Sequence, residues 1–246
     1  MTINPKIMKK IFFTFALLLS SLCSSTLSAQ SAEEIVQKHI EAKGGAEAWK
    51  KVKATHMKMT ASMMNMELPI SIWIEAPDKM RNVVSFQGKE IITVVNGNEG
   101  WMVNPMMGNT KAEPMPESAL KDIKDQADLA GPLMDYKAKG HSIEYLGADD
   151  MDGTEVYKIK LTEKEGDMTT FFIDKDSYML LKMTSKKMVN GQETENSIEF
   201  SDYRKVDGLS FAFSTTSGMA GQNFESKVTE LKVNPSIDSK LFSKPE

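Results

Sequence analysis

The residues that most often carry out chemistry in proteins are few in this sequence and widely separated. The chain of 246 residues contains three histidines, His39, His56 and His141, and a single cysteine, Cys23. Zinc sites need histidine or cysteine ligands at short spacings, such as His-Glu-x-x-His, and these histidines show no such spacing. We therefore expect each histidine to lie on a helix face or a strand edge, and we predict no metal site.

The segment Asp150-Met151-Asp152-Gly153 has some of the acidic residues of a calcium-binding loop. In such a loop aligned on this segment, the first and last ligand positions would be Ala148 and Ile159, which have no side-chain oxygen. The segment is therefore interpreted as a tight turn.

Sequence signatures of common enzymes are also missing. The chain has no Gly-x-Ser-x-Gly nucleophile motif and no phosphate-binding Gly-Lys-Ser/Thr loop. We predict that the protein is not an enzyme and that it uses no cofactor. A pair of catalytic carboxylates need not be close in sequence, so an enzyme acting on glycans or lipids stays open as an alternative.

Arg81 differs from the other cations because the chain has only two arginines among its 30 basic residues. It lies in a predicted strand after Pro77 and Asp78, on the same strand face as Val83. One interpretation is a surface cation near Asp78. The other is a guanidinium that binds backbone carbonyls of a lid, or the anionic head of a ligand.

Methionine is unusually frequent, at 19 residues. Methionine is flexible and polarizable, and it therefore suits a surface that adapts to varied apolar shapes. We predict that Arg81 and a set of apolar residues bind the ligand. The apolar residues are Met57, Met59, Met63, Trp73, Val83, Trp101, Leu120, Ile123 and Met134. The alternative for each apolar member is ordinary core packing.

Most of the chain has the period-two alternation of strands. Odd positions are apolar over residues 55–63, and even positions are apolar from Met66 to Ile74, a change of phase that predicts a hairpin. Short, regular intervals between later turns predict consecutive antiparallel hairpins. Counting the segments gives roughly eleven strands in one domain, which we place at residues 31–246.

Residues 105–139 interrupt this pattern. Pro105, Pro114 and Pro116 disfavour strand pairing there. A helix is predicted to begin at Glu117 or Ser118 and to carry, at helical spacing, Leu120, Ile123, Ala127, Ala130 and Met134. We expect this segment to form a lid over the sheet.

The N-terminal region contains a predicted export signal, whose removal changes the net charge of the chain, and a predicted helix. Residues 1–29 form a predicted export signal cleaved after Ala29, and a lipid anchor at Cys23 is not expected because Ser20 occupies the usual leucine position. After cleavage, 27 basic residues oppose 34 acidic ones, a net charge of −7, which disfavours nucleic-acid binding. No second apolar run is long enough to span a membrane. A helix with a capping box is predicted from Ser31 to Gly44.

Several short motifs resemble the LolA/LolB-like group of lipoprotein carriers. They are Pro77–Arg81, Ile92–Gly97, Gly100–Pro105, Phe172–Asp174, Leu180–Lys182, Phe200–Tyr203 and Val206–Leu209. The resemblance implies a mainly β (α+β) fold, an incomplete antiparallel barrel with an N-terminal helix and a helical lid on its concave face. It also implies that Arg81 matches an arginine that holds the lid. Met80 departs from the group's pattern, which has an aromatic residue there.

The expected function follows from the export signal, the apolar lid and this resemblance. We predict a periplasmic carrier or chaperone that binds lipoprotein acyl chains or other lipids for transport toward the outer membrane. The alternative on the same fold is an envelope-sensing module whose partner is another envelope protein.

Overall fold

The computed structural model describes residues 31–63, 66–189, 192–219 and 222–245. The predicted export signal, with Cys23 and the cleavage site at Ala29, lies outside the described residues.

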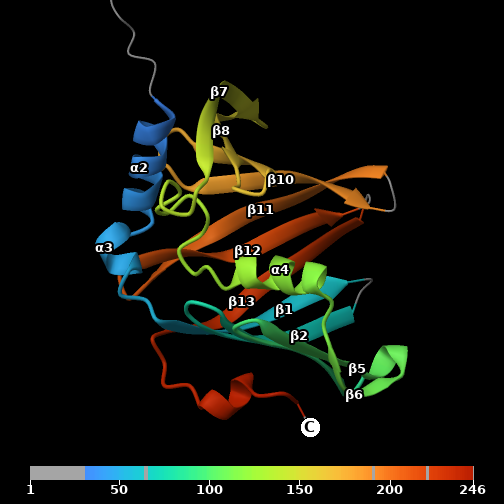
Figure 1. The fold of residues 1–246 in the computed structure, drawn as a ribbon. Coiled ribbons are helices and arrows are strands. Elements are labelled where there is room, and N and C mark those ends of the chain that lie inside the picture. Colours follow the sequence, from blue (N-terminus) through green and yellow to red (C-terminus); the bar gives the residue numbers. More distant parts are fainter. Residues whose placement is uncertain (1–30, 64–65, 190–191, 220–221, 246) are drawn as a thin grey trace, which may run out of the picture. The chain divides into compact units, whose positions relative to one another are not determined.

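A single antiparallel sheet of thirteen strands makes up most of the structure (Figure 1). Its strand order is β6-β5-β4-β3-β2-β1-β13-β12-β11-β10-β9-β8-β7, so β6 and β7 form the two edges and the sheet is open. The bounds are β1 (Ala54–Met63), β2 (Met66–Glu75), β3 (Lys79–Phe86), β4 (Lys89–Asn96), β5 (Glu99–Asn104), β6 (Asn109–Pro114), β7 (Ser142–Met151), β8 (Thr154–Thr162), β9 (Met168–Asp174), β10 (Leu180–Val189), β11 (Gln192–Val206), β12 (Leu209–Met219) and β13 (Gln222–Val233). The predicted fold class is confirmed.

The predicted strand count of roughly eleven was two short. β6 pairs with β5 although it ends at Pro114. An edge strand tolerates proline, because its outward N–H groups have no ladder partner to lose. β12 and β13 are separate strands that pair from Ser214 to Met219, whereas the sequence between them contains only a weak turn signal.

The helices are short and few in the described residues. They are α2 (Ala32–Ala42), α3 (Ala46–Trp49), α4 (Glu117–Gln126) and the 3-10 turns η1 (Pro105–Met107) and η2 (Ser239–Phe242). The lid helix ends earlier than predicted, so Ala130 and Met134 lie in the turns that follow it. Gly131 there has φ +83, a left-handed conformation that interrupts a helix, and Pro132 follows it.

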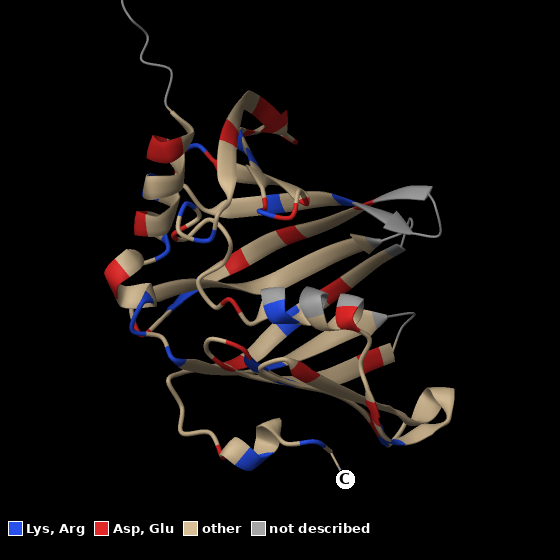
Figure 2. Ribbon diagram, in the orientation of Figure 1, with Lys and Arg blue, Asp and Glu red and all other residues tan. Residues whose placement is uncertain are grey.

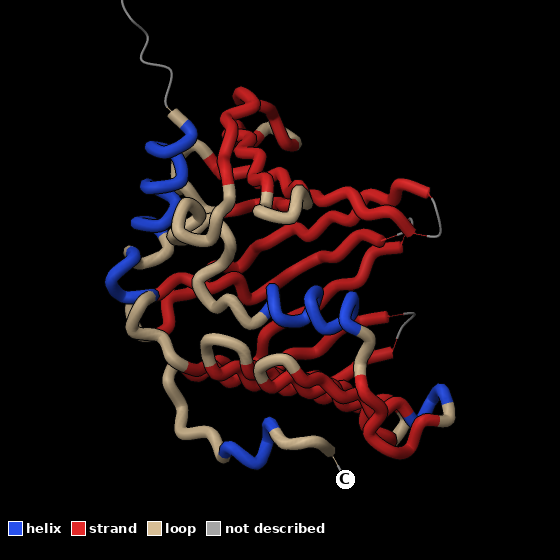
Figure 3. Tube along the Cα trace, viewed as in Figure 1, coloured by secondary structure: helices blue, strands red, loops and turns tan. Residues whose placement is uncertain are grey.

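The two faces of the β1–β5 half are covered by different segments (Figures 1 and 3). Directly paired residues of neighbouring strands point to the same side of a sheet. One row of directly paired residues runs across β1–β5 and consists of Met57, Ile72, Asn82, Thr93 and Met102. The adjacent row has its side chains on the opposite side of the sheet and consists of His56, Trp73, Arg81, Val94 and Trp101. We call the first side the helix face, because α4 packs there, and the second the tail face, because η2 packs there.

A cluster of buried apolar residues lies beneath α2. The helix buries Ile35, Val36 and Ile40. They belong to one apolar cluster with side chains of β8, β9 and β12, namely Ile159, Leu161, Phe171, Ile173 and Leu209. Their spacing along the chain places them on one side of α2.

The C-terminal end of α2 is attached to the start of β12 by backbone contacts. Ser210 N donates to Lys43 O (2.9 Å), and Ser210 Oγ donates to Ala42 O (3.2 Å). Gly44 has φ +118, and a Cβ there would lie 2.8 Å from Gly208 O, so only glycine fits this close approach. The attachment fixes the position of Lys43 relative to the sheet.

Gly44 and Gly45 offer a matched test of that close approach. Both have positive φ, but a Cβ at Gly45 would have no atom within 4 Å. We expect Gly45→Ala to lower the free energy of unfolding by about 1–3 kcal/mol through backbone strain alone. Gly44→Ala should cost at least about 1 kcal/mol more in urea unfolding, because the added methyl group displaces the α2–β12 contact. Equal costs would contradict the close approach.

Candidate ligand-binding site

An apolar pocket of about 280 Å³ lies on the helix face, between the sheet and the α2–α3 region. Its volume is close to the lower end, about 300 Å³, of pockets that hold small ligands. The lining residues are His39, Lys43, Trp49, Met57, Met59, Leu129, Leu180, Phe200, Tyr203, Ser210, Phe211, Ala212, Thr215 and Val228. Most are apolar, which suits a flexible hydrocarbon chain, and none is acidic.

Three polar side chains of the pocket donate hydrogen bonds to backbone carbonyls. His39 Nδ1 donates to Tyr178 O (2.8 Å), Tyr203 Oη to Leu180 O (2.7 Å) and Ser210 Oγ to Ala42 O (3.2 Å). A neutral imidazole and a hydroxyl each have one proton to donate. Those protons are therefore used within the protein.

Burial keeps His39 and Tyr203 neutral. Desolvation lowers the pKa of His39 to about 4, with a smaller contribution from the nearby charge of Lys43. Desolvation also raises the pKa of Tyr203 above its ordinary value. Both shifts have the sign expected when an ionised form is moved out of water.

Lys43 brings a cation to the pocket. Its Nζ donates to Ala130 O (3.1 Å) and lies 4.6 Å from the centroid of the Trp49 ring. Burial lowers the pKa of Lys43 to about 8, although the charge of Asp128 acts in the opposite direction. At neutral pH the ammonium form is therefore the main species.

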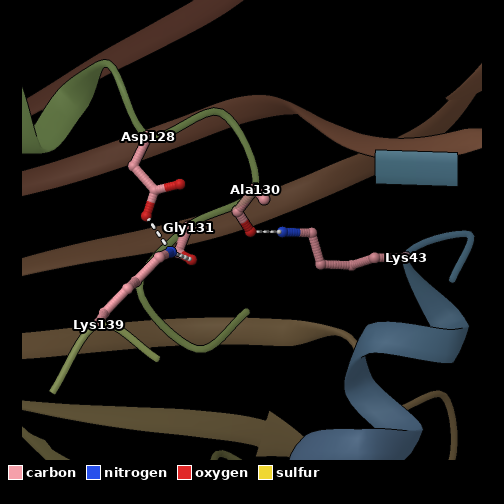
Figure 4. A network of polar contacts seen from close by, with 5 residues as sticks. All are labelled: Lys43, Asp128, Ala130, Gly131 and Lys139. Atoms are coloured by element: carbon pink, nitrogen blue, oxygen red, sulfur yellow. Dashed lines mark hydrogen bonds and ion pairs between the residues drawn. The ribbon is translucent and has the colours of Figure 1, made fainter. Parts of the chain in front are cut away.

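Two lysines hold the segment that follows α4 (Figure 4). Lys43 binds Ala130 O from one side, and Lys139 Nζ binds Asp128 Oδ2 (2.5 Å) and Gly131 O (2.9 Å) from the other. This segment supplies Leu129 to the pocket, and its contacts with the two lysines therefore position one wall.

The structure places the predicted binding residues on both faces of the sheet. Met57 and Met59 line the apolar pocket. Leu120 packs toward Gly100 on the same face, and Ile123 is half-buried in α4. Met134 is buried in the core cluster with α2 and is not among the residues that line the pocket. Met63 lies in β1, but its side chain is outside the described residues.

Trp73, Arg81, Val83 and Trp101 lie on the tail face, away from the apolar pocket. The first three line a separate groove of about 260 Å³ together with Pro69, Ser71, Ser85, Glu90 and Leu241. Alternation alone groups side chains by face but does not reveal which face a distant helix covers. A ligand-binding role for these four residues stays a prediction.

Arg81 binds a backbone carbonyl, as one interpretation of the sequence held, but the carbonyl belongs to another segment. Its Nη1 donates to Leu241 O (3.2 Å) in η2 on the tail face. Beside it, Phe242 is fully buried. The predicted bond from Arg81 to the lid is therefore corrected: Arg81 holds the C-terminal segment.

Sequence reasoning missed several lining residues, above all Lys43 and Leu129. A lysine before Gly44-Gly45 has the pattern of an exposed helix end, so nothing marks its burial. Phe200 and Phe211 were missed as well, because the faces and neighbours of residues on β10–β13 depend on the register of the sheet.

Charged residues of both signs are interspersed over the sheet and helices in Figure 2. Among the described residues, no three His, Cys, Asp or Glu side chains are grouped so that they could hold a metal ion. No helix in the described part of the chain has both the length and the apolar character needed to span a membrane.

No family model and no curated protein sequence matches this chain. Solved structures do match it. A LolA superfamily protein from Nitrosomonas europaea is 12% identical, with a TM-score of 0.58 over 88% of this chain and 99% of the other. A DUF1329 family protein from Desulfovibrio piger is 11% identical, with a TM-score of 0.60 over 87% and 98%.

A third similar structure is an outer membrane lipoprotein-sorting protein domain from Vibrio parahaemolyticus. It is 13% identical, with a TM-score of 0.54 over 86% of this chain and 95% of the other. At such low identity the likeness concerns the fold. The chain has a LolA-like fold.

Replacing Arg81 tests which segment it holds. We expect Arg81→Leu to speed hydrogen exchange of the η2 amides by about tenfold, the effect of losing one charge-assisted hydrogen bond. Exchange in α4 should be unchanged. The control is Arg204→Leu, which removes the exposed ion pair with Asp202 (2.6 Å). Faster exchange in α4 but not in η2 would restore the lid interpretation.

His39 predicts a pH dependence of stability. Its folded pKa of about 4 lies below the ordinary value of 6.5, so the unfolded chain takes up the proton first as pH falls. Stability should therefore decrease from pH 6.5 to pH 4, by up to about 3 kcal/mol from this group. Urea unfolding of His39→Gln should show a smaller decrease than the wild type. His141→Gln, which alters a histidine outside the pocket, is the control variant.

Proposed function

We propose that this protein is a periplasmic lipid carrier that shelters an acyl chain of a lipid or lipoprotein in the apolar pocket. The observation that carries the proposal is the pocket itself, whose walls include Met57, Met59, Phe200 and Phe211. The export signal expected at residues 1–29 supports the location.

The driving force would be removal of the acyl chain from water. Each buried CH₂ group contributes about 0.8 kcal/mol. Methionine side chains can adjust to chains of different shape, because they are unbranched and have several rotatable bonds. Affinity can therefore come from burial without a specific polar contact along the chain.

Movement of part of the wall would allow a chain to enter and leave the pocket. The segment at Ala130 is held by single hydrogen bonds from Lys43 and Lys139 to its carbonyls, and by the ion pair of Lys139 with Asp128. An ion pair that is partly exposed contributes about 0–1 kcal/mol. Such contacts are weak enough to break and re-form during loading and release.

The proposal assigns binding and no catalysis to the pocket. Its described lining contains no carboxylate that could act as an acid or a base, and its histidine is neutral and bound to Tyr178 O. The LolA-like fold supports a lipid-handling role, since one of the similar structures is a lipoprotein-sorting domain.

A charge placed in the pocket should abolish apolar binding. We expect wild-type protein to bind the neutral fluorescent probe N-phenyl-1-naphthylamine, and Met59→Glu to bind it at least tenfold more weakly, because a buried carboxylate is strongly disfavoured. Fluorescence titration measures the affinities, and circular dichroism checks the fold.

Met168→Glu is the matched control, since Met168 is 56% exposed and lies outside the pocket. Mass spectrometry of gently purified protein should also detect acyl lipids. Wild-type protein that neither binds the probe nor retains any lipid would rule out the carrier.

A further inference from the structure

The polar side chains of the apolar pocket differ in their capacity to donate hydrogen bonds to a ligand. His39, Tyr203 and Ser210 each donate their proton to a backbone carbonyl of the protein itself. Thr215 adds a neutral hydroxyl. These four side chains are neutral, and they have little remaining capacity to donate hydrogen bonds to a ligand.

Lys43 is different because an ammonium has three N–H donors. One of them reaches Ala130 O, and the Trp49 ring lies near the same nitrogen. Donor capacity therefore remains for an oxygen atom of a ligand. Lys43 is itself a lining residue of the pocket, together with Leu129 and with residues of α2 and β12.

The charge of Lys43 is not neutralised by a direct partner. Among the described residues, it forms no ion pair within 4.0 Å. Asp128 influences it through space, but the carboxylate of Asp128 is bonded to Lys139 at 2.5 Å. The pocket thus combines apolar walls with the ammonium group of Lys43, which forms no ion pair with a described residue.

We propose that the apolar pocket selects amphiphiles with a single anionic carboxylate head, the head binding Lys43 and the chain lying against Met57 and Met59. This inference rests on the proposed lipid-carrier function and names its ligand class, a long-chain carboxylate. One cation with limited spare donors matches one carboxylate better than a dianionic phosphate. A volume of about 280 Å³ also favours a single chain.

The test compares cis-parinaric acid, a fluorescent fatty acid, with its uncharged methyl ester at pH 7. Wild-type protein should bind the acid at least tenfold more tightly than the ester, since a charge-assisted hydrogen bond contributes about 1.5–3 kcal/mol. Lys43→Met should bind acid and ester with equal affinity, near that of the wild type for the ester. Lys43→Arg should keep the preference for the acid.

Lys50→Met is the control for the loss of one positive charge. Lys50 is exposed next to α3 and pairs with Glu47, so its replacement should leave the preference for the acid unchanged. If Lys43→Met fails to fold, the acid-to-ester ratio of the wild type still tests the preference for a carboxylate.

The outcomes separate the two proposals. Equal binding of acid and ester by the wild type would overturn the carboxylate inference and leave the lipid carrier standing. Binding of neither probe would overturn the carboxylate inference, and it would overturn the carrier as well if N-phenyl-1-naphthylamine also fails to bind and no lipid is retained. An acid preference that survives in Lys43→Met would assign the head to another group and reject the role of Lys43.

Discussion

Cross-strand register is the constraint on which the rest of this structure depends. In an antiparallel sheet, a slip of one residue would move every side chain of a strand to the other face. Here the register places Met57 beside Ile72 and His56 beside Trp73, so neighbouring residues of β1 serve different faces. The apolar pocket, lined by residues of β1 and β10–β13, and the groove beside η2, lined by residues of β2–β4, are therefore separate sites on opposite faces of one sheet.

The attachment of α2 to β12 determines what the helix face can bind. Contacts of Ser210 with Ala42 O and Lys43 O fix the helix end, and Trp49 Nε1 adds a third bond, to Lys43 O (3.2 Å). These bonds leave the side chain of Lys43 directed to the segment after α4. Backbone geometry, more than side-chain chemistry, therefore brings a cation to an apolar site.

How much was predictable depends on the distance over which each signal acts. Alternation is local, so the sequence predicts the β1–β2 hairpin and the shared face of Met57 and Met59. Helical spacing is also local, but it extended α4 to Met134, because apolar residues beyond Gly131 continue the period by chance. The tertiary bonds of Arg81 to Leu241 and of Lys43 to Ala130 join segments 160 and 87 residues apart. Neither the composition nor the spacing of residues indicates which distant segments will form such hydrogen bonds.

The burial of Lys43 has an energetic cost. A fall of its pKa from 10.5 to about 8 means that keeping the charged form costs about 3 kcal/mol of folding stability below pH 8. Methionine at this position would fill a similar space beside Trp49 without that cost. Buried charges that lower stability break the usual rules of core packing. Such exceptions are concentrated at functional sites, where a group destabilises the fold but serves binding. A ligand carboxylate would offset the cost by giving the ammonium a partner, so that loading would stabilise the folded protein.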